Sequence, residues 1–446
     1  MNKIGSILEE VLEKINPSEK ELEEINSSIE KFLKVFEQRL KTNKIKAEVF
    51  LGGSFAKGTV MKKDCYDLDV YVRFEEELSD KEMSELVKKS LKGSKKVSIV
   101  HGSRDYFRIK LKDDLFIEVV PVKKISKPDK AENITDLSYS HVKYIKKKVK
   151  NKKVLDEIKI AKAFCYANKC YGAESYINGF SGYALELLVA HYKSFEKFLK
   201  EMTKAIKTNK GPKNLWSKEY EGKWEELKKK IIIDIEKDYK KKENILMDLN
   251  SSKLGSPVIL IDPTFKQRNA LAALSEETFS RFKQAAEKFL KNPSIKSFEL
   301  EKTDLEKVKS QALKAKREFV LIEAQTSKAE GDVAGTKLLK FYNHFCGETE
   351  KIFEVKKKGF NYNGKKAARY YFVVKPKKEI LFAGPFVKDK DNLKAFERVH
   401  KNYTIKKGRV YAKEKIDFGI KEFIKKWKSD NKVKIDEMYI TSLEVV

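Results

Sequence analysis

Residues 52–59 read Gly-Gly-Ser-Phe-Ala-Lys-Gly-Thr, and residues 67–74 read Asp-Leu-Asp-Val-Tyr-Val-Arg-Phe. The second stretch alternates polar and apolar residues, so as a β-strand it places Asp67 and Asp69 on one face and the apolar side chains on the other. Two carboxylates on one face repel each other unless a cation lies between them, and their hard oxygen ligands suit Mg²⁺. The strand therefore predicts a magnesium site.

The glycine-rich stretch lies between the apolar run Ile45–Leu51 and a short expected helix. Gly52 and Gly53 permit a tight turn, and the backbone N–H groups that follow, from Ser54 onward, are free to hold a phosphate. The order of strand, phosphate turn and carboxylate strand indicates a site that handles nucleotides.

A third carboxylate interrupts a later apolar strand, Phe116–Val122, in which Glu118 shares a face with Phe116 and Val120. A charged residue in such a strand needs a reason. Either the strand lies at the edge of the sheet with Glu118 in water, or Glu118 is a third metal ligand beside the two aspartates.

The chain is strongly basic. Its 446 residues, enough for two to four domains, include 96 Lys and Arg against 67 Asp and Glu, a formal net charge of +29. A positive field gathers phosphates, which favours nucleic acid as a partner, although a lysine-rich proteome would give the same excess without that role. The run of lysines between Lys143 and Lys153 is open to the same two interpretations, a phosphate-binding face or a solvated helix.

No run of about 18 apolar residues occurs, and the amino terminus has no signal-peptide core, so we expect a cytoplasmic protein without a membrane partner. The four cysteines form no Cys-x-x-Cys pair and are expected to be reduced thiols. The oligomeric state is left open, with a homodimer among the alternatives.

The hydrophobic patterns predict a mixed sheet with helices first, then helices with one buried strand, and then an antiparallel α+β region of the kind that grips RNA, or else a purely structural domain. The expected strands are 45–51, 67–74, 97–100, 106–112, 116–122, 257–261, 319–324, 352–360, 369–375 and 379–386. The expected helices are two within 1–40, broken at Asn16-Pro17, and then 80–92, 154–171, 183–202, 224–239, 276–290 and 333–346.

The ordered set of Gly53-Ser54, Asp67-x-Asp69 and Glu118 resembles the polymerase-β-like nucleotidyltransferase superfamily. Further segments make nearly the whole chain similar to the archaeal, class I CCA-adding enzymes. These segments are Tyr171-Gly172-Ala173-Glu174, Gly179-Phe180-Ser181-Gly182-Tyr183, Asp262-Pro263 with Arg268-Asn269, and Gly384-Pro385 before Arg398.

The resemblance implies an α+β fold with a nucleotidyltransferase head at 1–142, a helical neck at 143–265, and a tRNA-binding body and tail at 266–446. It implies template-independent addition of C, C and A to the 3′ end of tRNA from CTP and ATP, with two Mg²⁺ ions. The catalytic and metal-binding residues would be Asp67, Asp69 and Glu118. The nucleotide-binding residues would be Ser54, Lys57, His141, Lys162, Tyr171 and Arg268, the last reading the base.

The family pattern often has arginine at Lys57 and aspartate at Glu118, and neither departure removes the chemistry. The other residues also have ordinary interpretations. His141 would be a surface or capping histidine, Tyr171 a core aromatic, Lys162 a lysine that snorkels to water, and Arg268 a cap on Asp262.

Three other functions remain as alternatives. A poly(A)- or oligoadenylate-type polymerase would belong to the same superfamily, and its product would be an ATP-only tail instead of three defined nucleotides. A non-catalytic RNA-binding protein would not need the three carboxylates. An enzyme that modifies a small molecule would need only the head and neither the positive charge nor the remaining 300 or so residues.

Overall fold

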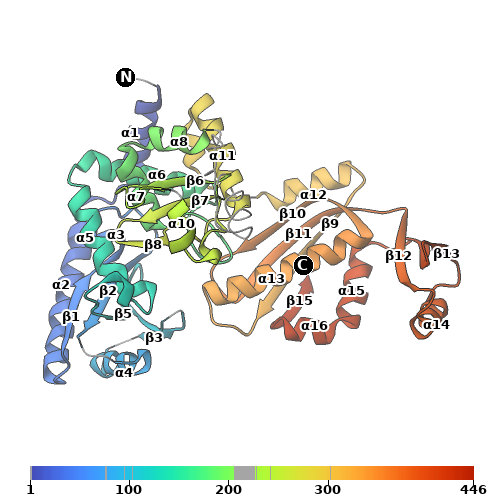
Figure 1. Ribbon diagram of the computed structural model, residues 1–446, viewed down its shortest axis with the longest axis horizontal. Coiled ribbons are helices and arrows are strands. Elements are labelled where there is room, and N and C mark those ends of the chain that lie inside the picture. Colours follow the sequence, from blue (N-terminus) through green and yellow to red (C-terminus); the bar gives the residue numbers. More distant parts are fainter. Residues whose placement is uncertain are drawn as a thin grey trace. The chain divides into compact units, whose positions relative to one another are not determined.

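The computed structural model describes residues 3–75, 78–94, 96–102, 104–204, 227, 229–241, 243–301 and 303–446. The chain forms two compact units, Met1–Glu301 and Lys302–Val446, which are described separately below (Figure 1). The finer division of the chain at residues 142 and 265 stays a prediction.

The first unit contains a five-stranded mixed sheet in the order β1-β2-β5-β4-β3, in which β2 and β5 are parallel and the other neighbours are antiparallel. This confirms the predicted sheet. Its strands are β1 Ala47–Leu51, β2 Tyr66–Phe74, β3 Val97–Val100, β4 Tyr106–Lys112 and β5 Leu115–Lys123.

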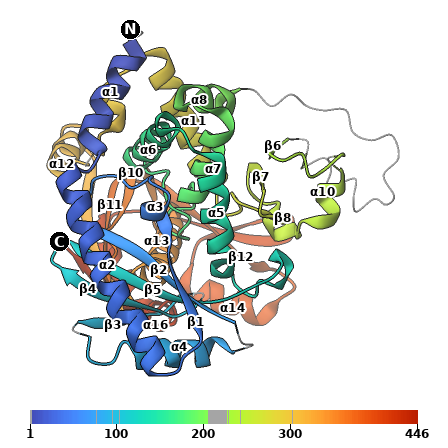
Figure 2. The ribbon, with the colours of Figure 1, turned by 90° about the vertical axis from the view of Figure 1, so that its left-hand side faces the viewer.

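One face of this sheet is covered by α2 (Glu19–Thr42) and α4 (Asp80–Ser90) (Figure 2). The alternation in β2 sends Leu68 and Val70 into the same buried cluster as Phe36 of α2. The first helix, α1 (Lys3–Ile15), ends before Asn16-Pro17, as predicted, and Ser18 caps α2 in a capping box with Glu21. The opposite face of β2, which carries Asp67 and Asp69, lies outside this buried cluster.

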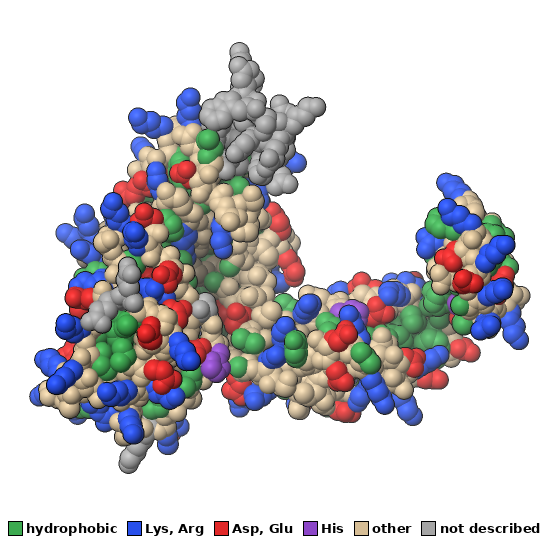
Figure 3. Space-filling model, turned by 60° about the horizontal axis from the view of Figure 1, so that its bottom comes forward, with side chains coloured by type: hydrophobic (Ala, Val, Ile, Leu, Met, Phe, Trp, Pro, Cys, Tyr) green, Lys and Arg blue, Asp and Glu red, His purple; other side chains and the backbone are tan. Residues whose placement is uncertain are grey.

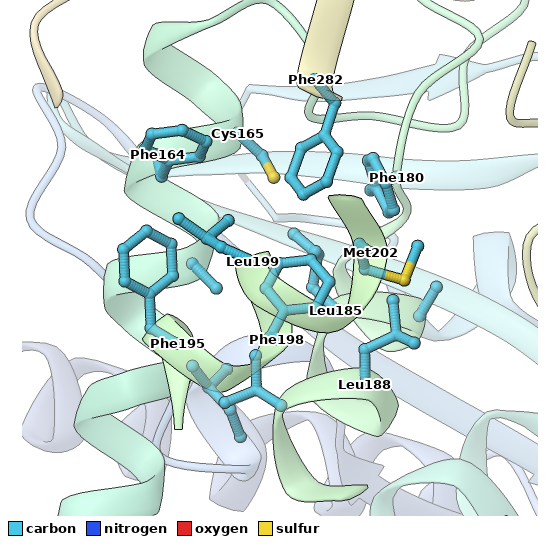
Figure 4. Close-up of a cluster of buried hydrophobic side chains, with 14 of the residues drawn as sticks. Phe164, Cys165, Phe180, Leu185, Leu188, Phe195, Phe198, Leu199, Met202 and Phe282 are labelled. Atoms are coloured by element: carbon cyan, nitrogen blue, oxygen red, sulfur yellow. The ribbon is translucent and has the colours of Figure 1, made fainter. Parts of the chain in front are cut away.

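Helices α5 to α8 and α11 form a second core in the same unit. Figure 4 shows aromatic side chains from three of them, including Phe164, Phe195 and Phe282, packed together. The predicted helix 183–202 is wrong in its continuity, because Lys193 adopts a left-handed φ of 67° and Ser194 caps a new helix. The helical segments here are α3 Gly53–Ala56, η1 Pro128–Lys130, η2 Ile134–Leu137, α5 Ser138–Lys148, α6 Lys152–Ala167, α7 Gly182–Tyr192, α8 Phe195–Thr203, α10 Glu243–Asp248, η3 Ser251–Lys253, α11 Glu276–Lys291 and η4 Ile295–Phe298.

A small sheet in the order β6-β7-β8 completes the first unit, with β6 Ile231–Asp234, β7 Val258–Asp262 and β8 Phe265–Asn269. The predicted buried strand is β7. The predicted helix 224–239 is wrong over residues 229–239, which form β6 and irregular segments, whereas Leu227 is helical. Three consecutive isoleucines favour a strand because β-branched side chains fit a pleated sheet, and β6 pairs in parallel with β7. Residues 224–226 and 228 of that prediction lie outside the described residues.

The second unit is built on an antiparallel sheet in the order β10-β11-β9-β15, as expected for an α+β region, beside a smaller sheet β12-β14-β13. Its larger core gathers aromatic residues of the sheet with those of α13 and α15. The elements are α12 Leu305–Lys314, β9 Glu318–Thr326, α13 Asp332–Ile352, β10 Phe353–Tyr362, β11 Ala367–Pro376, β12 Glu379–Phe386, α14 Lys390–Val399, β13 Tyr403–Lys406, β14 Arg409–Lys415, α15 Ile420–Asp430, α16 Lys432–Glu437 and β15 Ile440–Val445.

On the face shown in Figure 3, Lys and Arg side chains are spread over both units and interspersed with Asp and Glu. The net charge of +29 is therefore not gathered on that face into a single basic patch. Among the described residues, no helix is both long enough and apolar enough to span a bilayer.

Candidate functional site

The three predicted carboxylates lie on the polar face of the large sheet. Asp69 of β2 is the direct neighbour of Glu118 on the parallel strand β5, and Asp67 lies two residues away on the same face as Asp69. Because β5 is hydrogen-bonded to β2 on one side and β4 on the other, the edge-strand interpretation of Glu118 is wrong. Glu118 is held inside the sheet, with only 22% of its side chain exposed.

Repulsion and burial act together on these carboxylates. Burial raises the pKa of Asp69 to about 6, with a further contribution from the charge of Asp67. Burial and the charges of both aspartates raise the pKa of Glu118 to about 7. Arg108 opposes this, with Nη2 2.7 Å from Asp67 Oδ1 and Nε 3.8 Å from Glu118 Oε1. One guanidinium among three carboxylates leaves the group short of positive charge.

These residues fit a divalent cation. Carboxylate oxygens are the ligands that Mg²⁺ prefers, and the negative charge of Asp67 and Asp69 that raises the pKa of Glu118 would be neutralised by such an ion. Within the described parts of the chain, however, no three acidic, histidine or cysteine side chains already converge on one point. Asp67 instead accepts the hydrogen bond from Arg108, so it would exchange this partner for an ion.

The phosphate turn lies directly on the carboxylate strand. The Gly52 N–H donates to the Asp69 carbonyl oxygen at 2.8 Å, and Gly53 has a φ of +61°. A Cβ atom on Gly53 would lie 1.7 Å from Asp69 Oδ2, so only glycine allows this approach. The contact holds Ser54, which is half-buried in the short helix α3, next to the metal-binding candidates.

Lys57 and Lys162 meet at a buried glutamate that sequence reasoning missed. Lys57 Nζ lies 2.6 Å from Glu186 Oε2, and Lys162 Nζ lies 2.8 Å from Glu186 Oε1. The Lys162 side chain is only 2% exposed, so the snorkelling interpretation is wrong. The one signal for Glu186 was a single charge within the apolar run Ala184–Val189.

Tyr171 lies beside this lysine pair. It forms a β-bridge with Phe180, and burial raises the pKa of its hydroxyl. A Cβ atom on Gly182 would lie 3.0 Å from the Tyr171 hydroxyl and 3.9 Å from Lys162 Cε, so this glycine leaves room for both side chains. The ring also packs on the edge of the helical core, in agreement with its interpretation as a core aromatic.

His141 and Arg268 meet at a second buried carboxylate, Asp262. His141 Nε2 is 3.2 Å from Asp262 Oδ2, Arg268 Nη1 is 2.5 Å from the same oxygen, and the Tyr183 hydroxyl donates to Oδ1 at 3.1 Å. The His141 ring stacks on Tyr183 with 3.9 Å between centroids. His141 is 9% exposed, so its interpretation as a surface histidine is wrong, whereas the predicted contact between Arg268 and Asp262 is present.

Neighbouring groups determine the protonation state of Asp262. Burial alone would raise its pKa, but the hydrogen bond and charge of His141 and the charge of Arg268 hold the pKa well below its ordinary value. Burial lowers the pKa of His141. The Asp262 group is therefore an ionised carboxylate that fixes the orientation of Arg268.

The Tyr183 ring connects the two buried groups. Its centroid is 5.9 Å from Lys57 Nζ and 5.9 Å from the guanidinium carbon of Arg268. A cavity of about 390 Å³ lies next to the Asp262 group, lined among others by Thr264 and Lys266. The predicted residues thus form three adjoining groups in the first unit, with the phosphate turn between the sheet and the lysine pair.

Two family models match the first unit. The model described as "tRNA nucleotidyltransferase, second domain" matches residues 156–299. The model described as "Second Messenger Oligonucleotide or Dinucleotide Synthetase domain" matches residues 2–163, which include the carboxylate strands and the phosphate turn.

Curated relatives named CCA-adding enzyme come from archaea. The protein of Nanoarchaeum equitans is 36% identical over 260 residues, which cover 58% of this chain and 59% of the relative. That of Methanocaldococcus jannaschii is 32% identical over 66% of this chain and 61% of the relative, and that of Saccharolobus solfataricus is 30% identical over 69% and 64%. The matched region thus spans about three-fifths of these relatives' length.

Among solved structures, that of a cytoplasmic RNA terminal U-transferase aligns with a TM-score of 0.49 and 11% sequence identity, covering 68% of this chain and 99% of that chain.

Proposed function

We propose that the chain adds C, C and A to the 3′ end of tRNA from CTP and ATP without a nucleic-acid template, because its sequence is similar to archaeal CCA-adding enzymes and to the second domain of a tRNA nucleotidyltransferase. The observation that carries the proposal is the match of residues 156–299 to the second domain of a tRNA nucleotidyltransferase, directly after a sheet that presents three carboxylates beside a phosphate turn.

The reaction proposed is an in-line nucleotidyl transfer. Asp67, Asp69 and Glu118 would hold two Mg²⁺ ions, for which their mutual repulsion and oxygen ligands are suited. Ions held by these carboxylates would supply Lewis-acid activation of the attacking 3′ hydroxyl and positive charge for the leaving pyrophosphate. Arg108 would release Asp67 and remain near Glu118 as a further positive charge.

The remaining residues would bind the nucleotide in two parts. Ser54 and Lys57 would contact the triphosphate from the turn, and Lys162 and Tyr171 from the helical core. Arg268 would read the base, because a guanidinium offers several N–H donors in one plane and only part of this set is used by Asp262. His141 would face the triphosphate and sugar while bound to Asp262.

The partners follow from the reaction. The tRNA acceptor arm and 3′ end would be bound by residues 266–446 as body and tail, with residues 1–142 as head and 143–265 as neck. Lysine-rich surfaces of mixed charge suit phosphate contacts made at many points. We place the reaction in the cytoplasm with its substrates, and sedimentation of the pure protein would decide whether a homodimer forms.

The decisive experiment incubates the protein with Mg²⁺, CTP, ATP and a tRNA that lacks its 3′ CCA. The expected product is three nucleotides longer and accepts no further addition. An ATP-only tail of variable length would instead indicate a poly(A)-type polymerase, and binding of tRNA without incorporation would indicate a non-catalytic RNA-binding protein.

A further inference from the structure

Glu186 is a carboxylate buried among leucines. It lies in α7 with 0% exposure, and its neighbours Leu185, Leu187 and Leu188 are buried to the same degree. Figure 4 shows Leu185 and Leu188 in the aromatic and aliphatic cluster of the helical core. A charge in such surroundings is costly unless cations and hydrogen bonds compensate it, so its partners explain its presence.

The partners of Glu186 come from two distant segments. Lys57 and Thr59 belong to the phosphate turn, and Lys162 belongs to α6. The Thr59 hydroxyl donates to Glu186 Oε1 at 2.8 Å, and Lys162 Nζ donates to both Glu186 Oε1 and Thr59 Oγ1 at 2.8 Å. Although burial opposes it, the charges of Lys162 and Lys57 lower the pKa of Glu186 to about 2. Glu186 is thus an ionised carboxylate whose charge is balanced by two ammonium groups.

The group as a whole keeps a positive charge. Two ammonium groups and one carboxylate sum to a net charge of +1, and this charge lies next to the carboxylate strand, where Lys57 lowers the pKa of Asp69. Without Glu186, the two ammonium groups would repel each other in a buried space. Glu186 is therefore what holds the two ammonium groups close together.

We infer that Glu186 is a positioning residue of the nucleotide site, which holds the ammonium groups of Lys57 and Lys162 where the triphosphate binds and does not itself contact the substrate. The inference rests on the proposed function, since that function is what brings a triphosphate to these lysines. It adds a residue from α7 to the site and connects the phosphate turn with the helical core.

The test compares Glu186→Gln with a matched control, Glu157→Gln. Both substitutions remove one negative charge from the helical core at nearly constant volume. Glu157 is half-buried on α6 and accepts a hydrogen bond from the Phe195 N–H at 2.7 Å, whereas Lys57 and Lys162 form their ion pairs with Glu186. Binding of CTP, ATP and inorganic tripolyphosphate is measured by calorimetry with Mg²⁺ and without tRNA, and thermal unfolding is followed in parallel.

We expect Glu186→Gln to lower the affinity for all three ligands by the same factor. The factor should be about 10- to 100-fold, as is usual when a residue that orients binding groups is lost. An equal factor is expected because the lysines face the triphosphate, which all three ligands share. Glu157→Gln should bind them as the unchanged protein does. A Glu186→Gln protein with a lowered unfolding temperature but unaltered binding would overturn the inference and make Glu186 a purely structural ion pair.

Glu186→Asp keeps the inference testable if the Gln variant does not fold. It retains the charge and shortens the side chain by one methylene, so KM for CTP and ATP should rise several-fold while kcat changes little. A KM equal to that of the unchanged protein would contradict the positioning role.

The two proposals fail differently. A wild-type chain that adds CCA while Glu186→Gln binds nucleotides normally would overturn the inference alone. A wild-type chain that binds the three ligands but makes no CCA would overturn the proposed function alone, and the binding comparison would still decide the role of Glu186. A wild-type chain that binds none of the three would overturn both.

Discussion

Two groups of acidic side chains lie on either side of the phosphate turn, and they differ in the cations that contact them. On the sheet, Asp67, Asp69 and Glu118 share one guanidinium, and burial raises the pKa of Asp69 to about 6 and that of Glu118 to about 7. On α7, Glu186 has two ammonium groups, and its pKa is lowered to about 2 although it is buried more completely.

Burial acts in the same direction on both groups, so it does not explain the difference. The ion pairs do: on the sheet, Arg108 is in contact with Asp67 and Glu118, and lysines act on Asp69 only from a distance, whereas Glu186 forms close ion pairs with two ammonium groups. The sheet group is therefore ready to take up positive charge from a ligand, whereas the α7 group is already complete and can serve as support. The first should matter for chemistry and the second for geometry and stability.

The largest effect is expected from Asp69→Ala or Asp67→Ala. Each removes a ligand from the proposed metal site, so addition of C and of A should both fall by on the order of a thousandfold or more, because metal ions supply several kcal/mol of transition-state stabilisation. Affinity for tRNA should change little, since it rests on phosphate contacts elsewhere. Single-nucleotide incorporation and filter binding measure the two quantities. A variant that still added either nucleotide at near the wild-type rate would remove the two-metal assignment.

The next largest effect is on stability, and it should have opposite signs for variants of Glu186 and of Asp69. Glu186→Ala leaves two buried ammonium groups without their counter-charge, which should lower the free energy of unfolding by about 3–5 kcal/mol. In metal-free buffer, Asp69→Asn removes charge repulsion among the carboxylates of the sheet. It should therefore raise the free energy of unfolding by about 1 kcal/mol, a gain typical of relieving strain at an active site. Urea unfolding monitored by circular dichroism gives both values. Equal losses in the two variants would erase the distinction between the groups.

The α7 group also predicts a pH dependence. The pKa of Glu186 is lower in the folded chain than its ordinary value of 4.5, so its contribution to stability is present above pH 4.5 and is lost as the pH falls toward about 2. The stability difference between the wild type and Glu186→Gln should therefore shrink across that interval. Unfolding midpoints of the two proteins at pH 6 and pH 3 provide the measurement, and a constant difference would assign the ion pair no role in stability.

The sequence predicts those features of the fold that depend on neighbouring residues better than those that depend on distant contacts. The period of two in residues 66–74 is a local pattern, so the strand, its buried face and the shared face of Asp67 and Asp69 were predicted correctly. The part of the predicted helix 224–239 that covers residues 231–234 is wrong, because charged flanks hid a β-branched run that is stabilised by pairing with β7. Tertiary pairing overrode the local pattern there.

No local sequence pattern indicates the partners of the two buried carboxylates, Glu186 and Asp262. Glu186 and its partner Thr59 are 127 residues apart in the chain, and Asp262 and His141 are 121 residues apart. Only the fold brings these partners together. The sequence therefore left open a snorkelling Lys162 and a surface His141, and the burial of both side chains contradicts these two interpretations. Likewise β15 pairs with β9 across more than 100 residues, and it was not predicted.

A smaller effect tests whether the charge of Glu118 or the length of its side chain matters for the reaction. Glu118→Gln keeps the shape but removes the charge and should reduce incorporation about 100-fold, whereas Glu118→Asp should stay active because a carboxylate remains in β5 beside Asp69. Incorporation rates at saturating Mg²⁺ measure both. An active Gln variant would mean that the sheet group needs only two carboxylates.

The smallest effect concerns base selection at the Asp262 group, which is a compensated carboxylate like the α7 group. A pocket that accepts C twice and then A cannot use a fixed template, but the guanidinium of Arg268, held by Asp262, offers donors in one plane to acceptor atoms of cytosine or adenine. Guanine and uracil present other donor and acceptor patterns, and each unpaired polar contact costs about 1–3 kcal/mol. Arg268→Ala should therefore raise incorporation of UTP or GTP relative to CTP and ATP by about tenfold, while the carboxylate sheet stays competent. Incorporation of each nucleotide on tRNAs ending before each C and before A gives the ratios. An equal loss for all four nucleotides would make Arg268 a structural partner of Asp262 and move base selection to another residue of the first unit.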